Sequence, residues 1–296
     1  MSVFALWNKD VEREFFKRTL KIATPEQLFY VTDDDRYVAY WEKGYKGHKA
    51  TLQSRNAFVG SFTEKWTKSL LEPIAKRMNL FVVEGVVCEE IGLSKKSPGD
   101  VAICKTNDRF QRAENILMIV EVKMSIVWNW EYNPSAGILQ CIGYYTTHQG
   151  NPSLLRSDTM LKAIGKAINI RVSNHKTAKI PIIVLGNTPI TKSYYDKVDH
   201  LRKNGILQGF YSVNPQPLDD PTHQDDIKAT QHKGFLRFDT YEELKQEMSR
   251  LLAEDSEFFS GMKTKRELGK MVDIASRQPT YEQKAEMFLK LLRNEG

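Results

Sequence analysis

The sequence lacks the features that mark several large classes of protein. Its three cysteines are odd in number and widely spaced, so it predicts neither a disulfide framework nor a zinc site. It has no uncharged apolar run of about 18 residues, and charges begin at Lys9, so we expect neither a membrane span nor a secretory signal. A glycine-rich phosphate loop is also missing. These absences predict a cytoplasmic protein without a nucleotide cofactor.

Positive charge is concentrated in one stretch of the chain. The formal net charge is +6, and residues 156–203 hold ten basic and three acidic residues. This stretch carries +7, while the remainder sums to −1. Such a concentration suits a polyanionic partner, although two solvated helix faces would give the same count. A chemical site is needed to decide between the two interpretations.

The spacing of apolar residues predicts an α/β chain. Phe58, Phe62 and Trp66 repeat every four residues, which is typical of a helix, here over 54–78. The run before Glu121 is apolar for five residues, as expected of a central strand buried on both faces. Further strands are expected at 80–92, 101–106 and 179–186, and further helices at 135–148, 157–170 and 191–205. This order indicates a mixed sheet flanked by helices.

We expect four parts along the chain. Residues 1–53 form an extension of short helices and a strand, and 54–212 form the core. Residues 213–233 contain three prolines, four aspartates and few apolar residues, which is typical of a long mobile loop. Residues 234–296 are expected to be helical after one short strand.

Two short segments carry the chemistry. Pro98-Gly99-Asp100 is followed, after twenty residues, by Glu121-Val122-Lys123. Residues i and i+2 of a strand share a face, so the glutamate and the lysine project together, and an aspartate starting the neighbouring strand can reach them. Two carboxylates and the Val122 carbonyl are hard oxygen ligands of the kind that Mg²⁺ prefers. The segments therefore predict a magnesium site.

This pattern resembles the PD-(D/E)XK nuclease motif, with Gly99 inserted between the proline and the aspartate. The resemblance implies a restriction-endonuclease-like core in which Asp100 and Glu121 bind the metal. It implies that Lys123 contacts the scissile phosphate and helps to position or deprotonate the attacking water. Glu64 matches a glutamate that many members place on the preceding helix. A solvated pair at a sheet edge is the alternative, but an apolar run is not typical of an edge strand.

Other residues are weaker candidates for contacts with nucleic acid. Trp128 and Trp130 follow the catalytic strand, where aromatic rings can stack on bases, although tryptophans also anchor cores. Gln140 lies on the expected helix 135–148. The basic stretch offers the remaining candidates for phosphate contacts, Lys162, Lys166 and Arg171.

The resemblance and the length of the chain favour a magnesium-dependent endonuclease similar to type II restriction enzymes. We expect it to act on double-stranded DNA as a homodimer, since two-fold symmetry matches the cutting of both strands. The alternatives are a repair or recombination nuclease, such as a junction resolvase or an exonuclease, and a non-catalytic DNA-binding protein on a degenerate nuclease fold.

Overall fold

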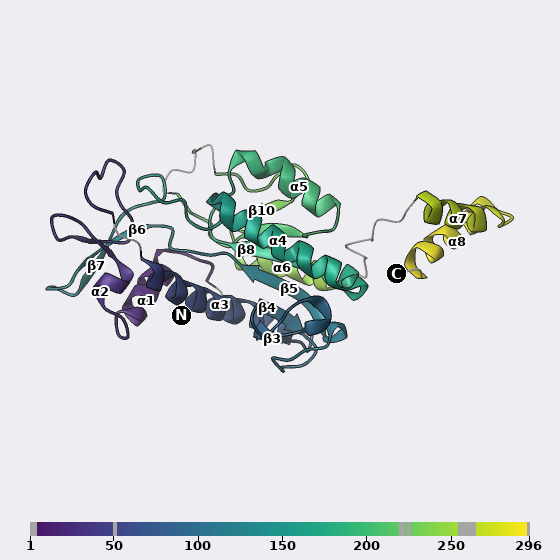
Figure 1. Cartoon of the computed structure of the whole chain (residues 1–296), viewed down its shortest axis with the longest axis horizontal. Coiled ribbons are helices and arrows are strands. Elements are labelled where there is room, and N and C mark those ends of the chain that lie inside the picture. The colour runs from purple at the N-terminus through teal and green to yellow at the C-terminus, as the bar shows by residue number, and fades with distance from the viewer. Residues whose placement is uncertain (1–4, 50–51, 219–222, 224–225, 254–264, 295–296) are drawn as a thin grey trace.

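A computed structural model describes residues 5–49, 52–218, 223, 226–253 and 265–294 (Figure 1). Its centre is a six-stranded mixed sheet in the order β10-β9-β8-β5-β4-β3. The first three strands of the sheet along the chain are antiparallel, and the last three run parallel to β5. The strands are β3 (Phe81–Val86), β4 (Gly99–Cys104), β5 (Ile116–Val122), β8 (Ile182–Gly186), β9 (Gly209–Ser212) and β10 (Phe235–Arg237).

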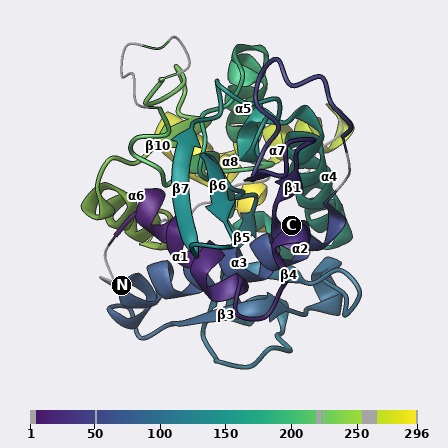
Figure 2. The same cartoon turned by 90° about the vertical axis from the view of Figure 1, so that its left-hand side faces the viewer.

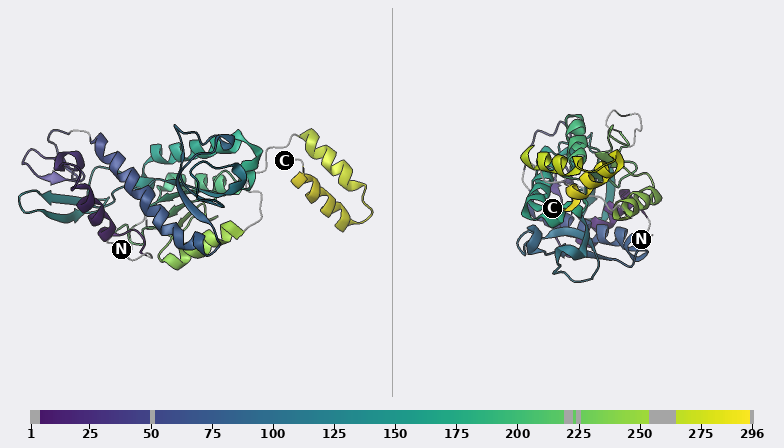
Figure 3. Two further views of the ribbon diagram at one scale, coloured as in Figure 1. Left: turned by 90° about the horizontal axis from the view of Figure 1, so that it is seen from below. Right: turned by 90° about the vertical axis from the view of Figure 1, so that its right-hand side faces the viewer.

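Helices cover both faces of this sheet. The long helix α3 (Gln53–Lys76) lies along one face, where α6 (Tyr241–Ala253) contacts it (Figure 3). Helices α4 (Ser157–Ser173) and α5 (Tyr195–Lys203) cover the other face. Side chains of β5 alternate between the two cores: Val120 packs with the α3 core and Ile119 with the α4 core. The period of two therefore directs Glu121 toward the α4 face.

A second sheet lies beyond one end of α3 (Figure 1), and Figure 2 shows the molecule from that side, with β6 and β7 in front. Its four antiparallel strands are β1 (Tyr30–Val31), β2 (Tyr37–Val38), β6 (Asn129–Asn133) and β7 (Ile138–Gly143). Two helices accompany it, α1 (Lys9–Thr19) and α2 (Pro25–Leu28). The sheet combines strands from the expected extension with strands from the expected core, and Phe15 and Phe16 of α1 share the buried cluster of α3. The described part of the first 53 residues therefore packs into the same core as α3.

Helix 135–148 was a wrong expectation, because its first half is the hairpin strand β7. Gly137 turns the chain with a φ of +65°, a conformation that a helix does not accommodate. The Asn133 side chain accepts a hydrogen bond from the Ala136 N–H at 3.1 Å and fixes the same turn. Strand β9, which had not been expected, is four residues long and wholly buried.

The expected core extends past residue 212. Strand β10 adds to the large sheet, and Leu244, Met248 and Leu251 of α6 are buried in the α3 core. Helices α7 (Lys265–Ser276) and α8 (Tyr281–Asn294) contact each other as a hairpin. Six residues of the expected mobile loop, 219–222 and 224–225, lie outside the described residues, whereas Val213 and Leu218 at its start are buried in the α3 core. Within the described residues, no helix has the length and apolar character needed to cross a membrane.

Candidate metal and phosphodiester site

The three residues of the motif meet where β4 begins and β5 ends. These strands are antiparallel neighbours, with Val101 opposite Val120, so Asp100 and Glu121 lie side by side. The Lys123 Nζ lies 2.6 Å from Glu121 Oε1 and 3.7 Å from Asp100 Oδ2. The Val122 N–H donates to Asp100 Oδ2 at 2.8 Å, which fixes that carboxylate against β5. The predicted convergence of Asp100, Glu121 and Lys123 is confirmed.

A fourth side chain completes the cluster from the facing helix. Lys166 of α4 places its Nζ 3.0 Å from Asp100 Oδ1 and 2.5 Å from Glu121 Oε2. Lys166 bridges the two carboxylates and its side chain is only 18% exposed, so the expectation that it contacts DNA phosphates stays a prediction. The motif does not predict that Lys166 joins the cluster, because this residue reaches the site only through the packing of α4 on the sheet.

The cluster is largely desolvated and its charges are balanced. Burial raises the pKa of the Glu121 carboxyl, and the neighbouring charge of Asp100 raises it further, against the opposing effect of the two lysines. Burial lowers the pKa of the Lys166 ammonium, but the carboxylates of Glu121 and Asp100 outweigh it, so the net shift is upward. Two carboxylates and two ammonium groups thus face one another in a small volume.

Glu64 lies on α3 within the electrostatic range of this cluster. Burial, and then the negative charge of Asp100, raises the pKa of the Glu64 carboxyl to about 7. Glu84 of β3 contributes in the same direction, and Lys166 opposes it. Glu84 had not been predicted as a neighbour of the site. Its signal in the sequence is a carboxylate inside an apolar strand, the same signal that marks Glu121.

Glu64 gives a pH-dependent prediction. The folded state holds its proton up to about pH 7, whereas the ordinary pKa of a glutamate carboxyl is 4.5, so this carboxyl opposes folding increasingly as pH rises between these values. We expect Glu64→Gln to be more stable relative to the wild type at pH 8 than at pH 5, in urea unfolding without metal. Glu14→Gln is the control, because Arg18 lowers the pKa of the exposed Glu14 carboxyl. An equal difference at both pH values would contradict the assignment.

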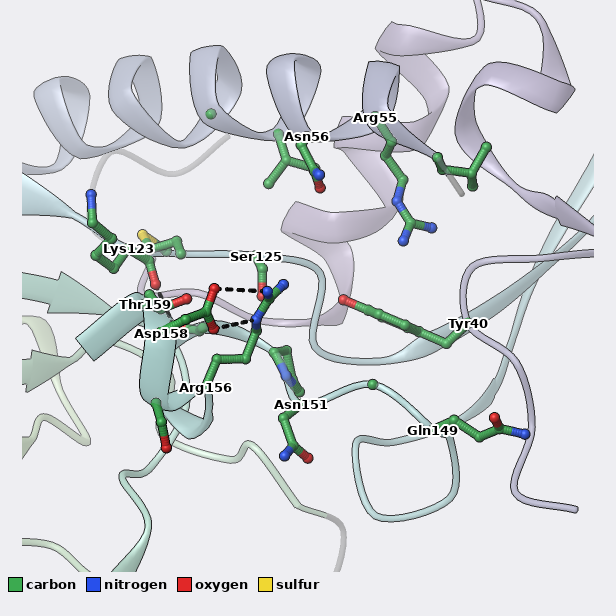
Figure 4. A pocket seen from close by; sticks show the side chains of 18 of the residues that line it. Tyr40, Arg55, Asn56, Lys123, Ser125, Gln149, Asn151, Arg156, Asp158 and Thr159 are labelled. Atoms are coloured by element: carbon green, nitrogen blue, oxygen red, sulfur yellow. Dashed lines mark hydrogen bonds and ion pairs between the residues drawn. The ribbon is translucent and has the colours of Figure 1, made fainter. Parts of the chain in front are cut away.

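A groove of about 940 Å³ opens beside Lys123 (Figure 4). The start of α3 forms one side with Asn56, and the start of α4 forms another with Arg156. The loop after β5 contributes Ser125, and residues 149–153 also line the groove. Arg156 is exposed and pairs with Asp158 at 2.9 Å. The groove thus brings polar and cationic side chains next to Lys123, which pairs with the carboxylate cluster.

The aromatic and arginine side chains at the back of the groove are held in place. Tyr40 donates its hydroxyl to the Ile126 carbonyl at 2.7 Å and stacks on His148. Arg55 is buried, donates to the backbone carbonyls of Leu28 and Ala39, and lies over the Tyr40 ring. These contacts make the wall rigid, so the shape of the groove exists before any ligand binds.

Three expected nucleic-acid contacts are placed elsewhere. Trp128 and Trp130 are buried in the core, and the Trp130 Nε1 donates to Glu12 at 2.9 Å, so neither ring is available to bases. Arg171 is buried and donates to the backbone carbonyls of Thr177, Ile180 and Ile206, which excludes it from phosphates.

Two other candidates remain on the surface. Gln140 lies on β7 opposite Glu131 and is exposed, and it does not belong to a helix as expected. Lys162 is exposed on α4, with its Nζ 3.7 Å from Asp158. Lys162 is therefore the member of the predicted basic trio that is accessible to a nucleic acid.

The donor atoms fit a magnesium ion. No group of three or more His, Cys, Asp or Glu side chains is arranged for a metal within the part of the chain that the structure describes. Mg²⁺ does not require one, because one or two carboxylates with water and substrate phosphate are its usual ligands. Asp100, Glu121 and the Val122 carbonyl supply that set. The buried Glu121 Oε2 lies 2.5 Å from the Lys166 Nζ, so it is an acceptor that already holds a cation.

Comparison of the chain with models of protein families, with curated proteins and with solved structures gave no significant match. The function is therefore inferred from the geometry of the cluster and the groove.

Proposed function

We propose that this protein is a magnesium-dependent endonuclease that hydrolyses phosphodiester bonds of double-stranded DNA. The observation that carries the proposal is that Asp100, Glu121 and Lys123 meet where β4 begins and β5 ends, next to a groove. The mixed sheet with helices on both faces is compatible with the restriction-endonuclease-like core that the motif implies. A site-specific enzyme similar to type II restriction endonucleases is the form we favour.

Each side chain has a defined part in this reaction. Bound Mg²⁺ would polarise the scissile phosphate and lower the pKa of the attacking water. Asp100 and Glu121 hold the metal, with Asp100 oriented by the Val122 N–H. Lys123 offsets the charge that develops on the phosphate oxygens. Glu64, whose pKa is about 7, is suited to accept a proton from the water near neutral pH.

The groove supplies the surface for the DNA backbone. Lys123 stands at its inner end, and Arg156 at the start of α4 places a cation on its rim. Asn56 and Asn151 also line it, and amide side chains can pair with base edges in the major groove. A homodimer remains part of this proposal. Its interface would use surfaces other than Leu244 and Met248 of α6, which are buried in the core.

Arg156 provides a test of the groove. We expect Arg156→Ala to weaken DNA binding in Ca²⁺ by roughly three- to tenfold. We also expect it to reduce the slope of log affinity against log salt by about 0.9, the loss of one phosphate contact. Lys192→Ala removes the same charge from an exposed residue outside the groove and should change neither quantity. Both quantities are measured by fluorescence anisotropy. If Arg156→Ala and Lys192→Ala change them equally, the DNA does not bind in this groove.

The function itself is tested by incubating the full chain with supercoiled plasmid, linear phage DNA and a four-way junction, in Mg²⁺ or in EDTA. Discrete magnesium-dependent fragments are the result that we expect. Shortening from the ends, or resolution of the junction, would instead identify the repair or recombination nuclease. Binding without cleavage of any substrate would favour the non-catalytic DNA-binding protein.

A further inference from the structure

Lys166 has no part in the motif, yet it makes the closest ion pair of the site. We propose that Lys166 is the resident counter-ion of the metal site: it bridges Asp100 and Glu121 in the metal-free protein and is displaced by Mg²⁺. It thereby sets the magnesium concentration at which the site fills. This inference rests on the proposed function, because it requires that the two carboxylates are the metal ligands.

The geometry divides the four carboxylate oxygens between two ammonium groups. Lys123 approaches Asp100 Oδ2 and Glu121 Oε1, whereas Lys166 approaches Asp100 Oδ1 and Glu121 Oε2. A single Lys166 nitrogen within 3.0 Å of oxygens from two different strands occupies the position of a bridging cation. Without it, two largely buried carboxylates would share the one remaining ammonium of Lys123.

Lys166 is the ammonium that must leave. Glu121 Oε2 pairs with the Lys166 Nζ at 2.5 Å, so a metal reaches this oxygen by replacing that lysine. Lys123 directly follows β5, the strand that carries Glu121, and it lines the groove, where a substrate phosphate would lie. Lys166 comes from α4, and its flexible four-carbon stem can move without disturbing either strand.

The affinity for the metal should therefore depend on the charge at residue 166. We expect Lys166→Met to bind Mg²⁺ about tenfold more tightly or better, because the ion no longer has to displace the Lys166 ammonium from Asp100 and Glu121. The metal-free variant should also melt at a lower temperature than the wild type and gain more from added Mg²⁺. Lys166→Arg keeps the charge and should bind with an affinity close to that of the wild type.

The experiment is calorimetric titration of Mg²⁺ into the full chain at pH 8 without DNA, with thermal unfolding in EDTA and in Mg²⁺. Lys162→Met is the matched control: this lysine lies on the same helix, its side chain is 76% exposed, and its substitution should leave the metal affinity unchanged. Lys166→Gln is a second neutral variant, which should bind Mg²⁺ as tightly as Lys166→Met. It replaces Lys166→Met in the experiment if that variant does not fold. Nuclease activity is not needed for either readout.

The outcomes separate this inference from the proposed function. Neutral variants that bind Mg²⁺ no more tightly than the wild type would overturn the role of Lys166 and leave the metal site in place. Binding that is tightened equally in Lys166→Arg would also overturn it, since the charge would not be the cause. If the wild-type protein binds no Mg²⁺, the proposed site and this inference are overturned together. The same follows if Asp100→Asn binds Mg²⁺ with the affinity of the wild type.

Discussion

Asp100→Asn and Glu121→Gln should each reduce magnesium-dependent DNA cleavage on the order of a thousandfold, because each removes an anionic donor from the metal site. The amides are close in size to the carboxylates, so the fold and DNA binding should survive. Initial rates of plasmid nicking in Mg²⁺, and binding in Ca²⁺, give the two readouts. Lys123→Met should lose cleavage to a similar extent while it retains the metal.

Glu90→Gln is the matched control for these variants. Glu90 lies away from the cluster and pairs with Lys176 at 3.0 Å, so its substitution should leave the rate of cleavage unchanged. Cleavage by Asp100→Asn or Glu121→Gln at the wild-type rate would contradict the assignment of the site. Loss of cleavage with loss of the folded state would show only that these residues are structural, which circular dichroism and unfolding curves detect.

Glu12→Ala should destabilise the protein by about 4 kcal/mol or more, since an unpaired buried donor costs roughly 1–3 kcal/mol. Glu12 is fully buried, and burial raises the pKa of its carboxyl to about 7. Its Oε1 accepts hydrogen bonds from Trp7 Nε1 at 3.0 Å and the Val127 N–H at 2.7 Å. Its Oε2 accepts from the Trp128 N–H at 3.3 Å and Trp130 Nε1 at 2.9 Å.

This network joins α1 to the segment between β5 and β6, so its loss should also loosen the small sheet against the core. Urea unfolding at pH 7 measures the change in the free energy of unfolding. Glu14→Ala provides the control, because the exposed pair of Glu14 with Arg18 is worth less than about 1 kcal/mol. A cost for Glu12→Ala as small as that of the control would mean that the four donors find other acceptors.

The motif could be located from the sequence because strand periodicity alone determines which side chains share a face. An apolar run ending in Glu121 and Lys123 places both side chains on one side of a buried strand, and the structure has them there. Glu84 could have been found by the same reasoning. The long helix α3 was predictable for a similar reason, since its apolar stripe repeats over 24 residues.

Lys166 and Glu12 could not be found in this way. Both lie on helices among other charged residues, and which helix face is buried depends on tertiary packing that no local pattern specifies. Strand β7 was mistaken for a helix because ILQCIGYY has apolar residues at spacings that suit either structure. The tryptophans were ambiguous from the sequence, and the hydrogen-bonded carboxylate of Glu12 explains why Trp130 is buried.

The central claim is that Asp100, Glu121 and the Val122 carbonyl bind a divalent metal beside the groove. A crystal of the full chain soaked in Mn²⁺, examined by anomalous scattering, tests this claim most directly. We predict one strong anomalous peak within coordination distance of both carboxylates, with the Lys166 ammonium withdrawn from them. An anomalous map without a peak at these carboxylates, in which both lysines still bridge them, would contradict it.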